Sequence, residues 1–329
     1  MQLKQSKYIS LLAGLLLFTI ACKKEDYAIP GANSALSNDC IKRTLGPNII
    51  GQNIEFAYAM AIPPEKGKLV SAQVEASIAG ARGTFLEHNS YFTKPNGQDT
   101  GVVVGQPSTT DGTKTTVTFN RDTSAATLRY YYFIPEEARG KPVSFTFTAK
   151  SSDGATVTYK MGPYMVSKMD MVRNLTVKNN DTSYISIADM MIYTRANVAA
   201  NAARIDLIYL YRSTPATFLH ALVSPAADAQ YLPNVTLPAG VNRSTKIRKV
   251  FNLQDYNLAR LQFGIYVDDL DFQKLNLADA PNFAINMKGE AGAWIETADG
   301  RYRAYIYINS ANENGSAVIS MKRYDMQTK

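Results

Sequence analysis

The chain has 329 residues, 46% of them hydrophobic and 19% charged, and its 35 Lys and Arg against 28 Asp and Glu give a formal charge of +7. That excess is mild for this length, and no basic run is denser than Lys246–Lys249, so we expect no nucleic-acid partner. A chain of this size can bury two hydrophobic cores. With only two cysteines, Cys22 and Cys40, it must hold those cores together without a disulfide framework.

The N-terminal segment has the pattern of an export signal. Lys4 and Lys7 precede the apolar stretch Ile9–Ala21, and Cys22 follows directly. A basic start, an apolar stretch shorter than the roughly 20 residues of a membrane-spanning helix, and a small residue at the cut predict a signal peptide over residues 1–21. The four residues Thr-Ile-Ala-Cys at positions 19–22 resemble the cleavage motif of bacterial lipoproteins, although leucine is commoner at the position of Thr19. The resemblance implies that Cys22 is acylated and attaches the protein to the membrane through a lipid anchor.

The segment after Cys22 indicates an address and a tether. Lys23–Asp26 reads Lys-Lys-Glu-Asp and is similar to the export tag of Bacteroides-type lipoproteins, which implies the outer membrane and its outward face. Residues 22–50 are polar and contain Pro30 and Gly31, so we interpret them as a lipidated tether and lead-in. Removal of the leader leaves 33 basic and 28 acidic residues, and acylation leaves Cys40 without a disulfide partner.

Residues 51–168 are predicted to form an immunoglobulin-like β-sandwich. Apolar residues at Val143, Phe145, Phe147 and Ala149 alternate with Ser and Thr, which is the period-two pattern of a half-buried strand. Further strands are expected over residues 54–62, 69–78, 116–119, 128–134 and 155–159, with turns at Asp-Gly pairs and one helical turn at 135–140. Several short strands in about 110 residues favour a sandwich, although the disulfide and core Trp of antibody domains are absent.

Residues 169–329 are predicted to form a second β-rich domain with one or two short helices. The seam between the domains is placed in the polar, turn-rich residues 168–181. Strands are expected at 205–211 and 264–267, and 253–261 has helical spacing. Residues 283–324 have the pattern of a four-stranded antiparallel meander. The fold class is therefore mainly β.

Motifs of nucleophilic or metal-dependent catalysis are missing from the sequence. His88 and His220 are the only histidines, and neither lies in a known catalytic motif, so both are interpreted as surface or packing residues. A glycosidase needs two opposed carboxylates, but Glu136 and Glu137 lie on a predicted connector with no acid placed opposite. We therefore predict a protein that is not an enzyme, and a carbohydrate-active enzyme is the less favoured alternative.

One acidic cluster offers a candidate metal site. Asp268, Asp269 and Asp271 follow a predicted strand, and Ca²⁺ prefers carboxylate and carbonyl oxygens from one loop. The EF-hand pattern is not met, so the alternative is a solvated loop at the end of a strand. No other cofactor is expected.

The second candidate site comes from strand register. If Asp299-Gly300 is a two-residue turn, Glu296 pairs with Arg303 and Trp294 pairs with Tyr305. Alternation then gathers five residues, which we call the aromatic face: Trp294, Glu296, Arg303, Tyr305 and Tyr307. Flat rings beside charged groups suit the apolar faces and hydroxyls of sugars, so this face is a candidate glycan-binding site. The alternative is that the helix near 253–261 or the first domain covers it.

A second group of rings lies in the first domain. Tyr130, Tyr131 and Tyr132 are consecutive, and neighbouring residues of a strand point to opposite faces. Tyr130 and Tyr132 can therefore share a face that Tyr131 does not, and core packing is the favoured interpretation.

Several segments of the mature chain, among them Asn38–Arg43, Ile134–Lys141 and Ile319–Tyr324, resemble an uncharacterised family of Bacteroides-type cell-surface lipoproteins, a family of unknown function. The address and architecture are also loosely similar to accessory glycan-binding lipoproteins of starch-utilisation-type systems. These resemblances imply a non-catalytic surface lipoprotein that binds a polysaccharide or oligosaccharide for nutrient acquisition. The alternative is a structural or adhesive lipoprotein whose partner is an outer-membrane protein.

Overall fold

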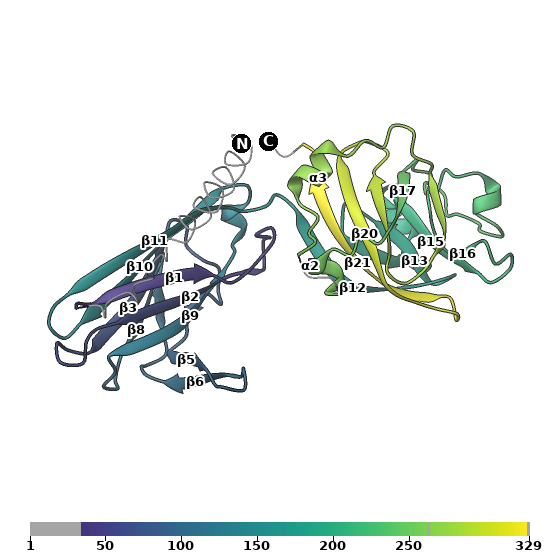
Figure 1. Cartoon of the computed structure of the whole chain (residues 1–329). Coiled ribbons are helices and arrows are strands. Elements are labelled where there is room, and N and C mark those ends of the chain that lie inside the picture. The colour runs from purple at the N-terminus through teal and green to yellow at the C-terminus, as the bar shows by residue number, and fades with distance from the viewer. Residues whose placement is uncertain (1–33, 262–263, 328–329) are drawn as a thin grey trace, which may run out of the picture. The chain divides into compact units, whose positions relative to one another are not determined.

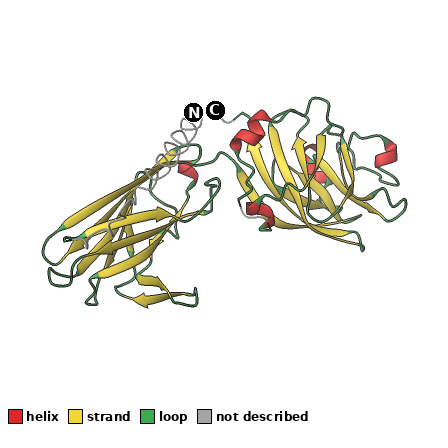
Figure 2. Ribbon diagram, viewed as in Figure 1, coloured by secondary structure: helices red, strands yellow, loops and turns green. Residues whose placement is uncertain are grey.

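The computed structural model describes residues 34–261 and 264–327. The predicted signal peptide over residues 1–21, the predicted lipidation site Cys22 and residues 23–33 of the predicted tether lie outside the described residues. Among the residues that are described, no helix is long and apolar enough to cross a membrane. Strands dominate, and they form two sandwich domains with few short helices (Figures 1 and 2).

The first domain packs two antiparallel sheets face to face. One sheet has the order β1 (Ser37–Lys42), β2 (Asn53–Ala61), β9 (Ala125–Phe133) and β4 (Phe85–Leu86). The other has the order β11 (Thr156–Met165), β10 (Pro142–Ser151), β3 (Leu69–Ala76), β8 (Lys114–Thr118) and β7 (Thr109–Asp111). A hairpin of β5 (Asn89–Thr93) and β6 (Asp99–Val103) and one 3₁₀ turn, η1 (Glu136–Ala138), complete the domain.

Alternation along β10 builds this core as the sequence predicts. Val143, Phe145, Phe147 and Ala149 are all buried. The ring of Phe56 from the facing sheet lies 4.8 Å from that of Phe145 and 5.3 Å from that of Phe147, centroid to centroid. Aromatic pairs at this spacing stabilise a core beyond the area that they bury. The period-two pattern is therefore enough to assign the inward face of the strand.

The three consecutive tyrosines divide as alternation requires. Tyr130 and Tyr132 are buried in the core between the sheets. Tyr131 points to the other face of β9 and stacks on Phe85 at 4.8 Å between ring centroids. The packing interpretation of the buried pair is confirmed.

The predicted lead-in is wrong for its last part. Residues 37–42 form β1, which pairs with β2 from Ser37 opposite Ala61 to Lys42 opposite Phe56. Cys40 of this strand is a buried free thiol. The segment Ser-Asn-Asp-Cys-Ile-Lys does not alternate polar and apolar residues, so only its pairing with β2 shows that it is a strand.

The second domain has two five-stranded antiparallel sheets. The first has the order β12 (Asp170–Lys178), β21 (Ser316–Asp325), β20 (Tyr302–Asn312), β19 (Ala291–Glu296) and β17 (Lys246–Phe251). The second has the order β14 (Met191–Thr194), β13 (Thr182–Ser186), β15 (Leu207–Arg212), β16 (Leu219–Val223) and β18 (Phe283–Met287). The described helices are η2 (Ala199–Arg204), η3 (Ala229–Tyr231), α2 (Tyr256–Ala259) and α3 (Asp269–Lys274).

Some details of the predicted second domain differ from the structure. The turn-rich seam expected over 168–181 is limited to residues 166–169, because residues 170–178 form β12. The last four strands exist, but β18 pairs with β16 in the opposite sheet, so the meander contains only β19, β20 and β21. Residues 264–267 form no strand, whereas the helical spacing at 253–261 corresponds to a shorter helix, α2. Local patterns do not specify which sheet a strand joins, because that depends on long-range packing.

Two apolar clusters cover the two faces of the sheet that contains β20. One lies between the sheets and includes Ile295, Ile306 and Ile319. The other lies on the outer face and includes Trp294 and Phe272, so α3 and the loops around α2 form a third layer there. This added layer covers the aromatic face.

Candidate functional site

The predicted register of the aromatic face is confirmed. Trp294 pairs with Tyr305 and Glu296 pairs with Arg303, on strands joined through Asp299-Gly300. Gly300 has a φ of +65°, but Asp299 is not among the residues with positive φ, so the turn is not the type I′ turn expected; the Gly300 N–H donates instead to the Thr297 carbonyl at 2.8 Å. Arg303 and Glu296 also form an ion pair, with 3.0 Å between Nη2 and the carboxylate.

The aromatic face is nevertheless buried, which corrects the expectation of an exposed sugar platform. Trp294 is 9% exposed, and Tyr305 and Tyr307 are 0% exposed. The Phe272 ring of α3 meets the Trp294 ring edge-on at 5.4 Å, and the Tyr305 hydroxyl donates to the Leu253 carbonyl. The rings were recognised correctly as one face, but a helix covers them because apolar area gains more from burial than from exposure.

The three aspartates of the candidate calcium site have separate structural partners, which corrects that expectation. Asp268 caps α3 by accepting from the backbone N–H groups of Leu270 and Asp271, and Asp271 accepts in return from the Asp268 N–H. Asp269 accepts from the Ser167 hydroxyl and the Lys168 N–H. Among the described residues, no group of three or more His, Cys, Asp or Glu is arranged to hold a metal ion.

His220 and Asp206 are buried polar groups of the second domain. The His220 ring lies in the core, 2.7 Å from the Tyr209 hydroxyl, and burial lowers its pKa. The packing interpretation of this histidine is confirmed. Burial raises the pKa of Asp206 to about 6, although Arg243 lies 2.9 Å away. The two facing atoms lack hydrogen-bond geometry, which explains why the cation offsets little of the desolvation.

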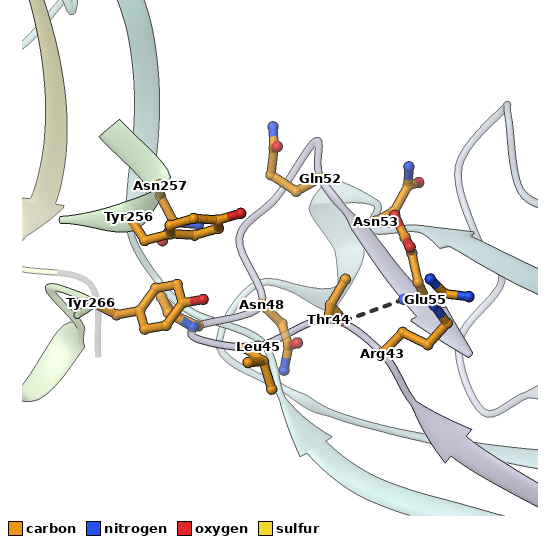
Figure 3. A pocket seen from close by; sticks show the side chains of 11 residues that line it. Arg43, Thr44, Leu45, Asn48, Gln52, Asn53, Glu55, Tyr256, Asn257 and Tyr266 are labelled. Atoms are coloured by element: carbon orange, nitrogen blue, oxygen red, sulfur yellow. Dashed lines mark hydrogen bonds between the residues drawn. The ribbon is translucent and has the colours of Figure 1, made fainter. Parts of the chain in front are cut away.

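A polar pocket of about 340 Å³ is the candidate site (Figure 3). This volume is at the lower end of the range for small-molecule sites, roughly 300–1,000 Å³. We call it the polar pocket, and its lining residues are Arg43, Thr44, Leu45, Pro47, Asn48, Gln52, Asn53, Glu55, Tyr256, Asn257 and Tyr266. The two segments that supply them, 43–55 and 256–266, belong to one compact unit of the chain.

Two tyrosine rings form the aromatic wall of the polar pocket. The rings of Tyr256 and Tyr266 lie 5.8 Å apart at 69°, edge to face. Gly46 packs directly on the Tyr266 ring, and a Cβ at that position would overlap it. Its φ of +76° also favours glycine. A backbone without a side chain is therefore required where the 43–55 segment passes this ring.

Hydrogen bonds hold the amide side of the polar pocket. The Asn48 amide donates from Nδ2 to the Met165 carbonyl at 2.8 Å. Thr44 Oγ1 accepts from the Glu55 N–H at 3.3 Å, the contact drawn in Figure 3. Arg43 and Glu55 contribute one charge of each sign and are not within ion-pair distance of each other or of another described charge.

A buried ion pair contacts the lining of the pocket. Lys322 and Asp255 are both 0% exposed, with 2.7 Å between Nζ and the Asp255 carboxylate. Asp255 caps α2 by accepting from the Leu258 N–H, and it also accepts from the Val267 N–H. Lys322 Nζ donates to Asn257 Oδ1 at 2.8 Å. The ion pair thus connects the pocket residue Asn257 to the last strand of the core.

The polar pocket continues into two neighbouring hollows. All three are lined by Pro47 and Asn48; one neighbour shares Tyr266 with the polar pocket, and the two neighbours share Met165 and Asp268 with each other. We call the three together the furrow.

Sequence reasoning missed this site. Its residues come from two segments about 200 positions apart, and four of the eleven are ordinary amides. Gly46 and Pro47 lie in the segment that was interpreted as tether and lead-in, and nothing there indicated that a tyrosine from the far segment packs against Gly46. Only the distance between the tyrosines and the asparagines in the folded chain makes the set recognisable.

The chain forms two successive antiparallel β-sandwiches, and residues from segments 43–55 and 256–266 line the furrow. These features define a mainly β, two-domain protein. Residues 33–166 match the model of a domain of unknown function (DUF4466), and residues 167–326 match that of another (DUF8576). The crystal structure of a DUF4466 family protein from Parabacteroides merdae ATCC 43184 is 51% identical, with a TM-score of 0.85 over 89% of this chain and 99% of that one. The chain therefore belongs to the DUF4466 family.

Two further solved structures are similar to this chain at much lower scores. The 35 kDa C-terminal fragment of the major pilin GBS80 of Streptococcus agalactiae is 12% identical, with a TM-score of 0.28 over 48% of this chain and 66% of that one. The Actinomyces fimbrial adhesin FimA is 12% identical, with a TM-score of 0.29 over 62% of this chain and 92% of that one. None of the curated proteins matches the chain.

Proposed function

We propose that this protein is a non-catalytic lipoprotein of the outer-membrane surface that binds a glycan for nutrient acquisition. The observation that carries the proposal is the polar pocket, with two tyrosine rings opposite side-chain amides. The leader and Cys22 support the address, because the pattern resembles that of acylated lipoproteins.

The chemistry of the pocket fits a sugar. Tyr256 and Tyr266 offer ring area at low conformational cost, and Asn48, Gln52 and Asn53 offer hydroxyl partners. Glu55 is the one carboxylate that lines the pocket, whereas glycoside hydrolysis needs a pair on opposite sides of the bond. The arrangement therefore supports binding over cleavage.

Affinity electrophoresis tests the proposal. The mature chain without its lipidated cysteine, residues 23–329, is run through gels containing amylopectin, xyloglucan, galactomannan, polygalacturonate or chondroitin sulfate. We expect at least one polysaccharide to retard it, and the double variant Gln52→Ala/Asn53→Ala to lose the retardation. The control is Gln106→Ala, an exposed amide outside the pocket, which should migrate like the unaltered chain. Retardation that survives the double variant would move the site elsewhere.

The alternative, an adhesive lipoprotein with a protein partner, predicts a different result. No polysaccharide would retard the chain, and a stoichiometric outer-membrane protein would co-purify with it. Mass spectrometry of the mature N-terminus tests the anchor, because the predicted lipoprotein lacks residues 1–21 and carries the added mass of acyl chains on Cys22.

A further inference from the structure

We infer that the polar pocket recognises a neutral saccharide, and that buried Lys322 is the positioning residue that turns the Asn257 amide donor toward it. This inference rests on the proposed function and specifies its ligand class. It comes from the hydrogen-bond directions that the protein imposes on two of the lining amides.

The hydrogen-bond donors of Lys322 are all used within the protein. Its ammonium carries three donors and no acceptor. Three oxygens receive them: Asp255 Oδ2 at 2.7 Å, Asn257 Oδ1 at 2.8 Å and the Val267 carbonyl at 2.8 Å. All three donors are used and the side chain is fully buried, so this cation holds its partners in place and is not itself a ligand contact.

The orientation of Asn257 follows from this bond. Only an oxygen can face an ammonium, so Oδ1 points to Lys322 and Nδ2 is on the opposite branch of the amide. Nδ2 has no hydrogen-bond partner among the described residues, and the residue lines the polar pocket. Asn257 therefore presents a donor whose direction is set before any ligand arrives.

Asn48 is oriented in the opposite sense. Its Nδ2 faces the Met165 carbonyl, which can only accept, so its Oδ1 is left as the free branch. The pocket thus combines one fixed donor with one fixed acceptor. A sugar hydroxyl both donates and accepts, whereas a carboxylate, sulfate or phosphate only accepts.

The charges of the pocket agree with a neutral ligand. Arg43 and Glu55 contribute one cation and one anion to its lining. The charge of Asp255 beneath it is compensated by Lys322. An acidic glycan would bring its anions next to Glu55 without a surplus of cations to receive them, and desolvated like charges repel strongly.

A pair of matched variants tests the inference in the same gels. Asn257→Asp keeps the shape and the acceptor that faces Lys322 but removes the Nδ2 donor. Leu45→Asp adds the same negative charge to the lining of the same pocket, at an exposed side chain that offers the ligand no hydrogen bond. We expect retardation by neutral polysaccharides only, weakened roughly tenfold or more by Asn257→Asp and less than about threefold by Leu45→Asp. The melting temperature of Asn257→Asp should not fall, because the carboxylate still accepts from Lys322.

A second variant tests the positioning role directly. Lys322→Met/Asp255→Asn removes both buried charges and frees the Asn257 amide to rotate, so affinity for the neutral polysaccharide should fall severalfold in molecules that remain folded by circular dichroism. Unchanged affinity in this folded variant would overturn the role of Lys322.

The remaining outcomes separate this inference from the proposed function. Equal losses in Asn257→Asp and Leu45→Asp would show a charge effect and overturn the donor argument. Retardation by polygalacturonate or chondroitin sulfate that Gln52→Ala/Asn53→Ala abolishes would overturn the neutral class and leave the glycan-binding function standing. Absence of retardation in every gel would overturn both.

Discussion

The buried ion pair between Lys322 and Asp255 makes a quantitative prediction about stability. Both side chains are 0% exposed, and Asp255 also accepts two backbone N–H bonds. Lys322→Met leaves that carboxylate buried without its cation. We expect the free energy of unfolding of the second domain to fall by about 3–5 kcal/mol, because removal of one partner exposes the full desolvation cost of the other.

The double variant should recover part of that loss. Asp255→Asn alone leaves the buried ammonium without its counter-ion, again at a cost of about 3–5 kcal/mol. In Lys322→Met/Asp255→Asn no charge is left buried, and the Asn side chain can still cap α2. The cost of the double variant should therefore be smaller than the sum of the two single costs by roughly 2 kcal/mol, within the range for contacting pairs.

Urea denaturation followed by circular dichroism measures the cycle. All four proteins, including the unaltered chain, are compared under one buffer condition, and the second transition is analysed if the two domains unfold separately. Additive single costs, with a coupling below about 0.5 kcal/mol, would refute the argument that the two charges stabilise each other.

Three further predictions concern other buried groups. Trp294→Ala should cost about 3–5 kcal/mol in denaturant unfolding, whereas Phe251→Ala, at a ring that is 64% exposed, should cost at most about 0.5 kcal/mol; equal costs would contradict the burial of the aromatic face. Burial raises the folded-state pKa of Asp206 from 3.8 to about 6, so protonation of this carboxyl should stabilise the fold by up to about 3 kcal/mol as the pH falls from 7 toward 4. The variant Asp206→Asn should lack this gain in stability, and parallel pH profiles of the two proteins would disprove the prediction. Burial also raises the pKa of the Cys40 thiol to about 12, so a thiol reagent should label it slowly at pH 8 in the native protein and rapidly in urea, and fast native labelling would contradict the buried position.

The sequence predicted local β structure well, because that structure has a local cause. The alternation along β10 assigned its inward face, and the Asp299-Gly300 turn assigned the register that pairs Trp294 with Tyr305. Both follow from the period of a strand and the φ that a tight turn demands, and neither needs a distant part of the chain.

The candidate sites depended on contacts that the sequence does not contain. The aromatic face was a correct set of residues in a wrong environment, because α3 brings Phe272 over it. The aspartates at 268, 269 and 271 looked like ligands for a cation, but helix capping and the Ser167 contact use their oxygens. A short segment of acids or rings shows which chemistry is available, and its neighbours decide whether solvent or a ligand can reach it.

The sequence by itself therefore determined a mainly β chain with two cores, a predicted lipoprotein leader, and the inward faces of its clearest strands. Tertiary structure alone decided that β18 joins the opposite sheet, that Trp294 is covered, and that Tyr266 packs on Gly46 beside Asn48 and Asn257. The physical reason is range: strand periodicity and turn geometry act over a few residues, whereas burial and pocket formation depend on segments about 200 positions apart in the chain.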